Sequence, residues 1–498
     1  MSSQPIRRSG ASFLELLSFR NRRIRLLGLL ALCLVAGIAV GLAAALVNPL
    51  ILIASVPVLA AGIWALRSDE YAVWLLIIVI AILPRFAAPV KFVLTPTFLD
   101  LALVLLVVAW FFRLSRHPLQ VRDVPIALPV LGLMVAAVVT FIVGLPNGAL
   151  TPLVLRRFAE LIISLAMVFV LISILRDHAI LRRSVRVFIL AGGLAALAGV
   201  LLYVIPSDLA IRLLSALRPF GYPTGPTVLH YVLDDPSQLQ RATGLWIDPN
   251  AYGGYLLVAG SVTLPQLFTH KPLLPKWIVF IILSVVGLAL VMTISRGAIL
   301  AFLCVAVLIG LLRYRRILLL AAVIVALALV LPQTSSLISH FAAGFAGQDL
   351  ATQMRFGEYK DAFRLIGRYP LLGVGFASTP DVDLYIGVSN MYLLIAQQMG
   401  LLGLSAFTIT IVVLYVSALR ARKMMLSDED LGAIWMGAFG GVTGALISGI
   451  FDHYFFNIDF HNSVMLLWLV IAFAVSSQMR PQHTSAAPVK ISAYGNQR

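Results

Sequence analysis

The sequence predicts an all-α, polytopic integral membrane protein with about 12–14 transmembrane helices. Of the 498 residues, 61% are hydrophobic and only 12% are charged, whereas soluble domains are about half apolar and roughly a quarter charged. Apolar runs of about 18 or more residues recur from Leu26 to Val475, and each is long enough to cross the ~30 Å hydrocarbon core as a helix. Basic residues also concentrate in every second loop between these runs, as expected for loops that remain in the cytoplasm.

Charged residues, prolines and glycines separate the expected spans. The spans cover residues 26–47, 50–66, 71–88, 94–112, 124–145, 155–175, 187–205, 250–269, 277–294, 298–312, 317–331, 391–418, 431–450 and 462–478. The breaks within the first two pairs of spans are the least distinct, so a count of twelve or thirteen is also compatible with the sequence. Because no convincing small-residue cleavage site follows the first run, we expect it to be retained as a span and not removed as a signal peptide.

The chain is expected to form one membrane-embedded body with two long outer loops. The predicted segments are a cytoplasmic N-terminal segment (1–25), N-terminal transmembrane helices (26–205), a first periplasmic loop (206–249), further transmembrane helices (250–331), a second, larger periplasmic loop (332–390), C-terminal transmembrane helices (391–478) and a flexible cytoplasmic tail (479–498). Long loops inside a compact body are usually functional or disordered. Aromatic residues, glycines and most of the outer charges lie in these two, which favours a functional role.

Lysine and arginine residues predict the orientation of these segments. With both termini in the cytoplasm, 25 of the 37 basic residues fall on the inner side, in agreement with the positive-inside rule. This distribution also accounts for the net charge of +16 without nucleic acid as a partner. Both cysteines, Cys33 and Cys304, lie within apolar runs and indicate no disulfide framework.

The second outer loop contains a predicted amphipathic helix in "MRFGEYKDAFRLIGRYP". Phe356, Tyr359, Phe363 and Ile366 recur at helical spacing and form one apolar face, while charged residues occupy the rest. Such a helix suits the interface between membrane and water. Pro370 and the glycines in "PLLGVGF" are expected to end it.

Three outer arginines are candidate binding residues, and each has a structural alternative. Arg241 precedes a span and could instead reach lipid headgroups as an interfacial residue. Arg296 is the charged residue of the tight turn in "MTISRGAIL" and could instead anchor that turn at the interface. Arg355, on the amphipathic helix, could instead pair with Glu358.

Together the three arginines suggest a polyanionic ligand held at the outer surface. A guanidinium group is permanently charged and presents a planar fork of donors that suits phosphate oxygens. The diphosphate of a lipid carrier is the obvious candidate, because arginines that neutralise a diphosphate leaving group assist displacement at the adjoining carbon. The residues after Arg241, Asp248-Pro249-Asn250, also have a simpler interpretation as the cap of the next helix.

Other polar residues give weaker signals. His453 and His461 flank "YFFNIDF" in a short outer turn, where Asp452 and Asp459 accompany them. An Asp/His pair could bind a metal or relay protons, although such residues more often have a solvated or structural role. Within the spans, Glu160 is expected to pair with nearby arginines on its own helix, and Asp100 has no evident partner in the sequence. No phosphate loop of the Walker type, zinc spacing or HExxH motif occurs.

Four motifs in order resemble those of the O-antigen ligases and their polymerase relatives, over roughly residues 200–420. "RATGL" resembles the Arg-x3-Leu element of that family's first large periplasmic loop, and "SRGA" resembles its arginine turn. "RFGEYKDAFRLIGRYPLLGVGF" resembles its periplasmic stretch of an arginine, an aromatic amphipathic helix and Pro-Leu-Leu-Gly-x-Gly. Ser389-Asn390, followed after nine residues by Gly400 and then Gly403, resembles a His-Asn element followed by Gly-x-x-Gly.

The resemblance implies a membrane glycosyltransferase with a C-type fold in the bacterial inner membrane. Such an enzyme moves a glycan from undecaprenyl diphosphate to an acceptor hydroxyl at the periplasmic face, with inversion and without a metal or other cofactor. By this resemblance Arg241 and Arg355 hold the donor diphosphate, and Arg296 makes a secondary phosphate or structural contact. The implied partners are the lipid-linked glycan, a glycan or lipid acceptor and the bilayer, with other polysaccharide assembly proteins as further candidates.

The sequence departs from the ligase pattern at Ser389, where the ligases have histidine. A serine hydroxyl cannot act as a base near neutral pH as imidazole can. Either another group serves, with Asp381, Asp383 and Tyr385 nearby, or the acceptor differs. This favours a polymerase of exopolysaccharide or O-antigen repeats, and a ligase or a protein O-glycosylating member stays open. Ser389 and Asn390 remain candidate catalytic residues with Arg241 and Arg355.

A transporter or flippase for an anionic lipid-linked polysaccharide is the main alternative. Arginines that line a membrane entrance would bind anionic cargo equally well. Transporters often consist of repeated halves, and the sequence contains no convincing internal repeat. A cavity open only to the outside would favour the enzyme, and a pathway through the body would favour transport. A purely structural membrane component would leave two long loops unexplained.

Overall fold

The computed structural model describes residues 57, 59–88, 95–112, 123–330, 346–347, 350–378 and 387–480. The chain divides into two units, Met1–Ala61 and Gly62–Arg498, and the helices from α3 onward belong to the second. The N-terminal segment 1–25, the expected span 26–47 and nearly all of the tail 479–498 lie outside the described residues.

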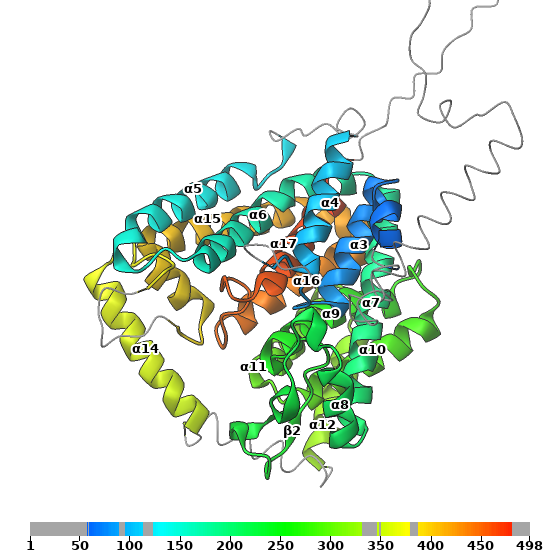
Figure 1. The fold of residues 1–498 in the computed structure, drawn as a ribbon. Coiled ribbons are helices and arrows are strands. Elements are labelled where there is room, and N and C mark those ends of the chain that lie inside the picture. Colours follow the sequence, from blue (N-terminus) through cyan, green and yellow to red (C-terminus); the bar gives the residue numbers. More distant parts are fainter. Residues whose placement is uncertain are drawn as a thin grey trace, which may run out of the picture. The chain divides into compact units, whose positions relative to one another are not determined.

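The described part of the second unit is almost entirely helical, which confirms the predicted all-α class of a polytopic membrane protein (Figure 1). Its α-helices are α3 (Asp69–Ile82), α4 (Phe98–Phe112), α5 (Ala127–Gly144), α6 (Pro152–Leu175), α7 (His178–Val204), α8 (Ser207–Ser215), α9 (Pro249–Phe268), α10 (Lys276–Met292), α11 (Arg296–Leu312), α12 (Arg316–Val330), α14 (Leu350–Arg368), α15 (Met391–Ser427), α16 (Gly432–Ser448) and α17 (His461–Gln478). The expected spans from 71 onward each fall on one of these helices.

Short elements order the loop between α7 and α9 and the turn after α5. These are the 3₁₀ turns η2 (Leu145–Asn147), η3 (Arg218–Phe220), η4 (Gly225–Val228) and η5 (Val232–Asp234) and the strands β1 (His230–Tyr231) and β2 (Gln240–Arg241). The two strands form an antiparallel hairpin in which His230 pairs with Arg241. The loop between α7 and α9 is therefore structured, as its aromatic and glycine content suggested.

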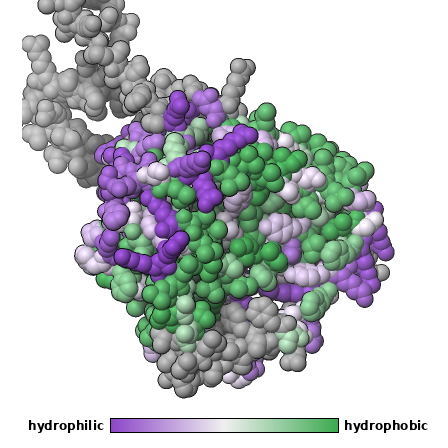
Figure 2. Space-filling view, turned by 180° about the vertical axis from the view of Figure 1, so that it is seen from behind, coloured by the Kyte–Doolittle hydropathy of each residue, from purple (hydrophilic) through white to green (hydrophobic). Residues whose placement is uncertain are grey.

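Five described helices are long and apolar enough to cross a membrane: α5 with η2, α6, α7, α15 and α17. Four shorter apolar helices, α4, α10, α11 and α16, accompany them. Figure 2 shows a broad hydrophobic face of the molecule with hydrophilic residues gathered toward its margins. This surface fits a protein that lies in a bilayer. The total span count and the orientation of the termini stay predictions.

Helices α9, α16 and α17 form the centre of the unit, where α16 contacts α9, α11 and α17, and α17 contacts α6. Every residue of α17 from Asn462 to Ser477 is buried, as expected for a helix that is apolar on all sides. Small residues allow the close approach of α9 and α16, because a Cβ atom at Gly437 would lie 2.8 Å from the carbonyl oxygen of Val262. This rigid centre carries the helix ends that build the site.

Helix α15 is interrupted at Gly400, and a neighbouring segment completes its hydrogen bonding. Gly400 has φ 63° and ψ −166°, a conformation open essentially to glycine alone. Residues 370–375, which we call the strap, follow α14 and lie against the interruption. Four backbone hydrogen bonds join the two segments: Val374 N to Gln397 O (2.9 Å), Gly375 N to Gln398 O (3.0 Å), Leu401 N to Pro370 O (2.7 Å) and Leu402 N to Leu371 O (3.1 Å).

Two of the sequence motifs form the two sides of this contact. "PLLGVG" supplies the strap, and Gly400 of the Gly-x-x-Gly element supplies the interruption that receives it. Gly373 has φ 65°, and a Cβ atom there would lie 2.5 Å from Gln397 O. These glycines are therefore required where two backbones meet without space for side chains.

We expect Gly400→Ala to lower the free energy of unfolding by about 2 kcal/mol or more, because the residue is strained and its Cβ would clash with the strap. A Cβ atom there would lie 2.5 Å from the backbone nitrogen of Leu372. Thermal unfolding of the purified protein in detergent measures the change. Gly287→Ala in α10 is the matched control, since no atom lies within 4 Å of its Cβ position and alanine favours a helix. Equal stability of the two variants would contradict the role given to Gly400.

Candidate functional site

The three arginines singled out in the sequence line one cavity of about 140 Å³. We call it the arginine cavity. Its lining comes from the loop between α7 and α9, the turn between α10 and α11, α14 and the C-terminal end of α16. The lining residues are Val232, Leu233, Arg241, Asn250, Ile294, Ser295, Arg296, Gly297, Arg355, Ser448, Phe451 and Asp452. Arginines separated by more than fifty residues in the chain thus meet at one place.

Arg241 is fixed in the cavity wall by two hydrogen bonds. Its Nε donates to the carbonyl oxygen of Thr293 (2.9 Å), and its Nη2 donates to Oδ1 of Asn250 (2.6 Å). The β1–β2 hairpin holds its backbone. These bonds use two of the five N–H donors of a guanidinium group. The contacts favour a positioned site residue over a side chain that extends to lipid headgroups.

Asp248 caps α9 beside the cavity, as the sequence indicated. Its carboxylate accepts hydrogen bonds from the backbone N–H groups of Asn250 (2.9 Å) and Ala251 (2.7 Å), and Pro249 occupies the first helical position. This cap fixes Asn250, which in turn holds Arg241. The N-terminus of a long helix also contributes partial positive charge at this point.

Arg296 begins α11 directly after a strained turn. Ile294, a buried β-branched residue, has φ 55°, which is a sterically costly conformation for its type. Such strain occurs preferentially where the surrounding structure fixes a functional residue. Gly297 permits the turn to approach the cavity wall, because a Cβ atom there would lie 2.7 Å from Cβ of Phe451.

Arg355 reaches the cavity from α14, and its neighbours attach that helix to the core. The hydroxyl of Tyr359 donates to the carbonyl oxygen of Ser389 (3.3 Å), and the carboxylate of Glu358 accepts from the backbone N–H of Ser389 (2.8 Å). Glu358 therefore binds another segment, which weakens the simple alternative of a pair with Arg355. Burial raises the pKa of the Tyr359 hydroxyl, and the charge of Arg355 opposes that rise.

Ser389 and Asn390, the sequence candidates for catalysis, lie beside the arginine cavity and are not among its lining residues. Asn390 caps α15 by accepting from the N–H groups of Tyr392 and Leu393 (both 3.0 Å), and its Nδ2 donates to the carbonyl oxygen of Ile450 (2.9 Å). These contacts give Asn390 a structural role at the start of the helix. Asp381, Asp383 and Tyr385, named as possible replacements for the ligase histidine, lie outside the described residues.

Asp452 is the acidic residue that lines the arginine cavity, and sequence reasoning gave it no role there. Its side chain is 14% exposed, and its Oδ1 accepts from the backbone N–H of His453 (2.8 Å). Burial raises the pKa of this carboxyl group, the nearby Asp248 adds to the rise, and His453 and Arg355 oppose it. The position of Asp452 directly after α16, in the same short loop as His453, was the available signal.

The electrostatics of the cavity favour an anionic ligand. Three guanidinium groups face it, together with one carboxylate. Burial lowers the pKa of the Arg241 guanidinium, the charge of Arg355 lowers it further, and Asp248 and Asp452 act in the opposite direction. A guanidinium group nevertheless remains protonated in proteins. A polyanion would offset both the burial and the mutual repulsion of these charges.

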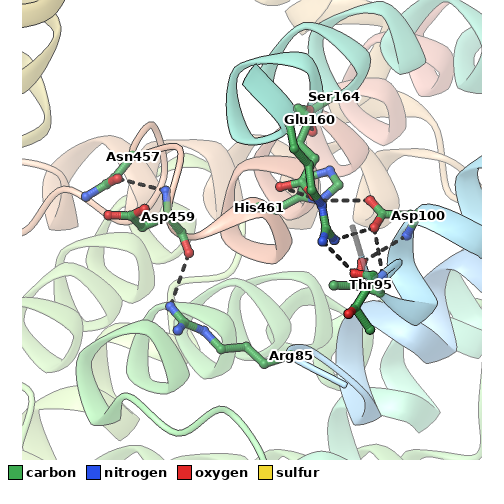
Figure 3. A network of polar contacts seen from close by, with 10 residues as sticks. Arg85, Thr95, Asp100, Glu160, Ser164, Asn457, Asp459 and His461 are labelled. Atoms are coloured by element: carbon green, nitrogen blue, oxygen red, sulfur yellow. Dashed lines mark hydrogen bonds and ion pairs between the residues drawn. The ribbon is translucent and has the colours of Figure 1, made fainter. Parts of the chain in front are cut away.

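A second cavity, of about 190 Å³, lies among neighbouring helix ends, and we call it the α6–α17 pocket. Its wall contains a charged network (Figure 3). Arg156 donates from Nη2 to Asp100 Oδ2 (2.6 Å), from Nε to Glu160 Oε1 (2.7 Å) and from Nη1 to the carbonyl oxygen of Thr95 (2.5 Å). The local pair expected for Glu160 is thus present, and Asp100 has gained a partner from a distant helix.

Among the described residues, three side chains resemble a metal-binding site: Asp100, Glu160 and His461. One potential ligand atom from each lies within 4.8 Å of the others. Nδ1 of His461 lies 3.6 Å from Glu160 Oε2 and 3.8 Å from Asp100 Oδ1. The guanidinium group of Arg156 already bonds to both carboxylates. The charge of Arg156 therefore balances both carboxylates at the position that a metal ion would otherwise occupy.

Residues 278–408 match the Wzy_C family, described as O-Antigen ligase. The matched region runs from α10 into α15 and contains Arg296, Arg355, Ser389 and Asn390, whereas Arg241 and Asp452 lie outside it. A search of curated proteins gives no match.

Inorganic pyrophosphate is expected to stabilise the purified protein, because it can occupy the arginine cavity. A ligand present at ten times its Kd stabilises the folded state by about 1.4 kcal/mol, which a thermal shift measures. Arg241→Ala or Arg355→Ala should remove most of that shift. Arg364→Ala is the matched control on α14, since Arg364 is 52% exposed and bonds to Asp361 (3.2 Å). A pyrophosphate shift that persists in both cavity variants would place the anion elsewhere.

Proposed function

We propose that this chain, whose residues 278–408 match the O-Antigen ligase family, is a membrane enzyme that transfers a glycan from undecaprenyl diphosphate to an acceptor hydroxyl. The transfer takes place at the periplasmic face of the bacterial inner membrane. The observation that carries the proposal is the meeting of Arg241, Arg296 and Arg355 in one cavity. Three such groups provide the charge and the donors that a diphosphate requires.

The donor diphosphate lies in the arginine cavity, with its lipid chain in the bilayer. Arg241 and Arg355 bind its oxygens, and Arg296 at the start of α11 adds a further positive charge. The two hydrogen bonds that hold Arg241 fix the direction of its remaining donors. Donors that are in place before the reaction stabilise developing charge without reorganisation, and for that reason they contribute strongly to catalysis.

The reaction is a displacement at the anomeric carbon. The acceptor oxygen attacks the face opposite the diphosphate, a new C–O bond forms, and the bond from the sugar to the diphosphate oxygen breaks. This geometry inverts the configuration. The electron pair of the broken bond stays on the diphosphate, where the arginines neutralise it, so that the departing group needs no metal ion.

Asp452 accepts the proton that the acceptor hydroxyl loses. It lines the same cavity as the three arginines, and burial raises the pKa of its carboxyl group above its usual range. A base with a raised pKa accepts protons more strongly near neutral pH. This role answers the question left by Ser389, whose backbone is bound by Glu358 and Tyr359 beside the cavity.

The acceptor is a growing glycan, so that the enzyme acts as a polymerase of O-antigen or exopolysaccharide repeats. An O-antigen ligase is the second candidate. The absence of the ligase histidine at Ser389 supports this choice. Transport fits the geometry less well. The arginine cavity is lined by the N-terminal ends of α9 and α11 and by the C-terminal end of α16. These helix ends lie together on one side of the bundle, whereas a transport pathway would run along the helices.

Arg241→Ala and Arg355→Ala should each reduce glycan transfer by about 10²–10³-fold, because each removes charge that stabilises the departing diphosphate. Incubation of the purified protein with lipid-linked repeat units, followed by gel analysis of the glycan ladder, measures this. Membrane expression should stay normal, and Arg364→Ala should transfer as the wild type does. Normal polymer length in both cavity variants would refute the assigned roles.

Asp452→Asn should remove most of the activity, and the remaining rate should no longer fall as the pH decreases (the acidic limb of the rate–pH profile). In the wild type the carboxylate must be ionised to accept a proton, so the rate falls as pH decreases through its pKa. That fall should be centred above the ordinary carboxyl value of 3.8. Asp361→Asn on α14 is the control and should keep the wild-type profile. An unchanged acidic limb in Asp452→Asn would assign the base to another residue.

A further inference from the structure

The α6–α17 pocket is a second cavity that the proposed reaction has not used. Its lining residues are Pro84, Arg85, Thr97, Leu153, Arg156, Arg157, Glu160, Trp246, Ala251, Asp459, Phe460, His461, Asn462 and Ser463. They come from the ends of α3, α4, α6, α9 and α17. We propose that this pocket is a saccharide subsite, which holds an uncharged sugar ring of the acceptor glycan; the acceptor assignment rests on the proposed function.

The first observation is an unpartnered amide at the pocket wall. The side chain of Asn462 lines the pocket, and the residue is 8% exposed. Its Nδ2 has no hydrogen-bond partner among the described residues. The Nε2 atom of the neighbouring His461 is likewise buried and unpartnered among them. Buried polar atoms normally find partners, so these two atoms on consecutive residues are left for a ligand that supplies hydrogen-bonding oxygens.

The second observation is that carboxylates already pair with two of the three arginines of this pocket. Arg157 forms an ion pair with Asp459. Arg85 donates from Nη2 to the carbonyl oxygen of Asp459 (3.2 Å) (Figure 3). Arg156 bonds to the carboxylates of Asp100 and Glu160. A cavity in which carboxylates neutralise two of the three arginines offers less to a polyanion than the arginine cavity does. It suits a neutral ligand with many hydroxyl groups.

The third observation is that polar and aromatic groups share this wall. The aromatic residues Trp246 and Phe460 both line the pocket, and the guanidinium group of Arg85 lies 4.9 Å from the centre of the Phe460 ring. A sugar ring has hydroxyl groups at its edge and C–H groups on its faces. Hydroxyl groups match amide, imidazole and carboxylate partners, and the C–H faces match aromatic surfaces. A few placed polar groups on an otherwise apolar wall are typical of small-ligand sites.

The position of the pocket relates it to the transfer reaction. Two consecutive residues at the start of α9 line different cavities: Asn250 lines the arginine cavity, and Ala251 lines the α6–α17 pocket. Asp248, which caps the same helix, acts electrostatically on both Arg241 and Arg85. The start of α9 thus lies between the two cavities. A sugar bound in the α6–α17 pocket would hold the acceptor chain next to the donor.

Two binding probes separate this inference from the proposed function. The first is the free oligosaccharide released by mild acid from the host's own surface polysaccharide, which carries no diphosphate. The second is farnesyl diphosphate, which carries no sugar. Isothermal titration of the full-length protein in detergent with each probe is expected to give saturable binding to the wild type.

Asn462→Ala and Asn462→Asp should each weaken oligosaccharide binding by about tenfold or more, because each removes the amide donor. Their farnesyl diphosphate affinity should stay within about twofold of the wild type, which also shows that the variants are folded. Arg241→Ala should weaken the binding of farnesyl diphosphate and leave the oligosaccharide affinity within about twofold of the wild type. Ser476→Ala is the matched control on α17, since Ser476 is buried and unpartnered among the described residues and lies outside the pocket.

The outcomes distinguish the two proposals. Wild-type protein that does not bind the oligosaccharide, or Asn462 variants that bind it as tightly as Ser476→Ala does, would overturn the saccharide subsite and leave the diphosphate result intact. Loss of farnesyl diphosphate binding in the wild type, with oligosaccharide binding still dependent on Asn462, would overturn the proposed function and leave the subsite standing.

Discussion

The gathering of like charges in a small, partly buried cavity is the constraint on which the site depends. Three guanidinium groups repel one another and lose hydration, so the fold must hold them in place at a cost. Asn250 and the carbonyl oxygen of Thr293 hold Arg241, the cap of α9 holds Asn250, and the turn at Ile294 sets Arg296 at the start of α11. The packed centre of α9, α16 and α17 is what makes this arrangement rigid enough to persist.

The sequence was sufficient for the fold class, for most helix positions and for the identity of the three arginines. Hydrophobic runs report membrane helices directly, because the bilayer requires about 20 apolar residues for each crossing. The cap at Asp248 and the end of α14 before Pro370 followed from local chemistry of the same kind. Signals of this type depend on neighbouring residues and therefore can be read along the chain.

The remaining features depend on contacts between distant segments. The position of Asp452 beside His453 marked a polar turn, but only the fold brings Asp452 to the same cavity as Arg241 and Arg355. The same holds for the partner of Asp100, which comes from α6, and for Ser389, whose surroundings are set by Glu358. Tertiary packing decided each of these three cases. The family resemblance marked Ser389 and Asn390 as candidate catalytic residues, whereas the local contacts of Asn390 give it a cap.

The interruption at Gly400 has a consequence for how the chain enters the bilayer. Helix α15 is divided at Gly400, and the part from Leu401 to Ser427 alone has 27 residues, a length of roughly 40 Å at ~1.5 Å per residue, which exceeds the ~30 Å of hydrocarbon. Peptide groups freed inside lipid are costly unless protein satisfies them, and the strap does so. The strap precedes α15 in the chain and is therefore synthesised first. The hydrogen-bonding partners of the interrupted helix therefore already exist when α15 enters the membrane. We expect the strap and α15 to integrate into the membrane together.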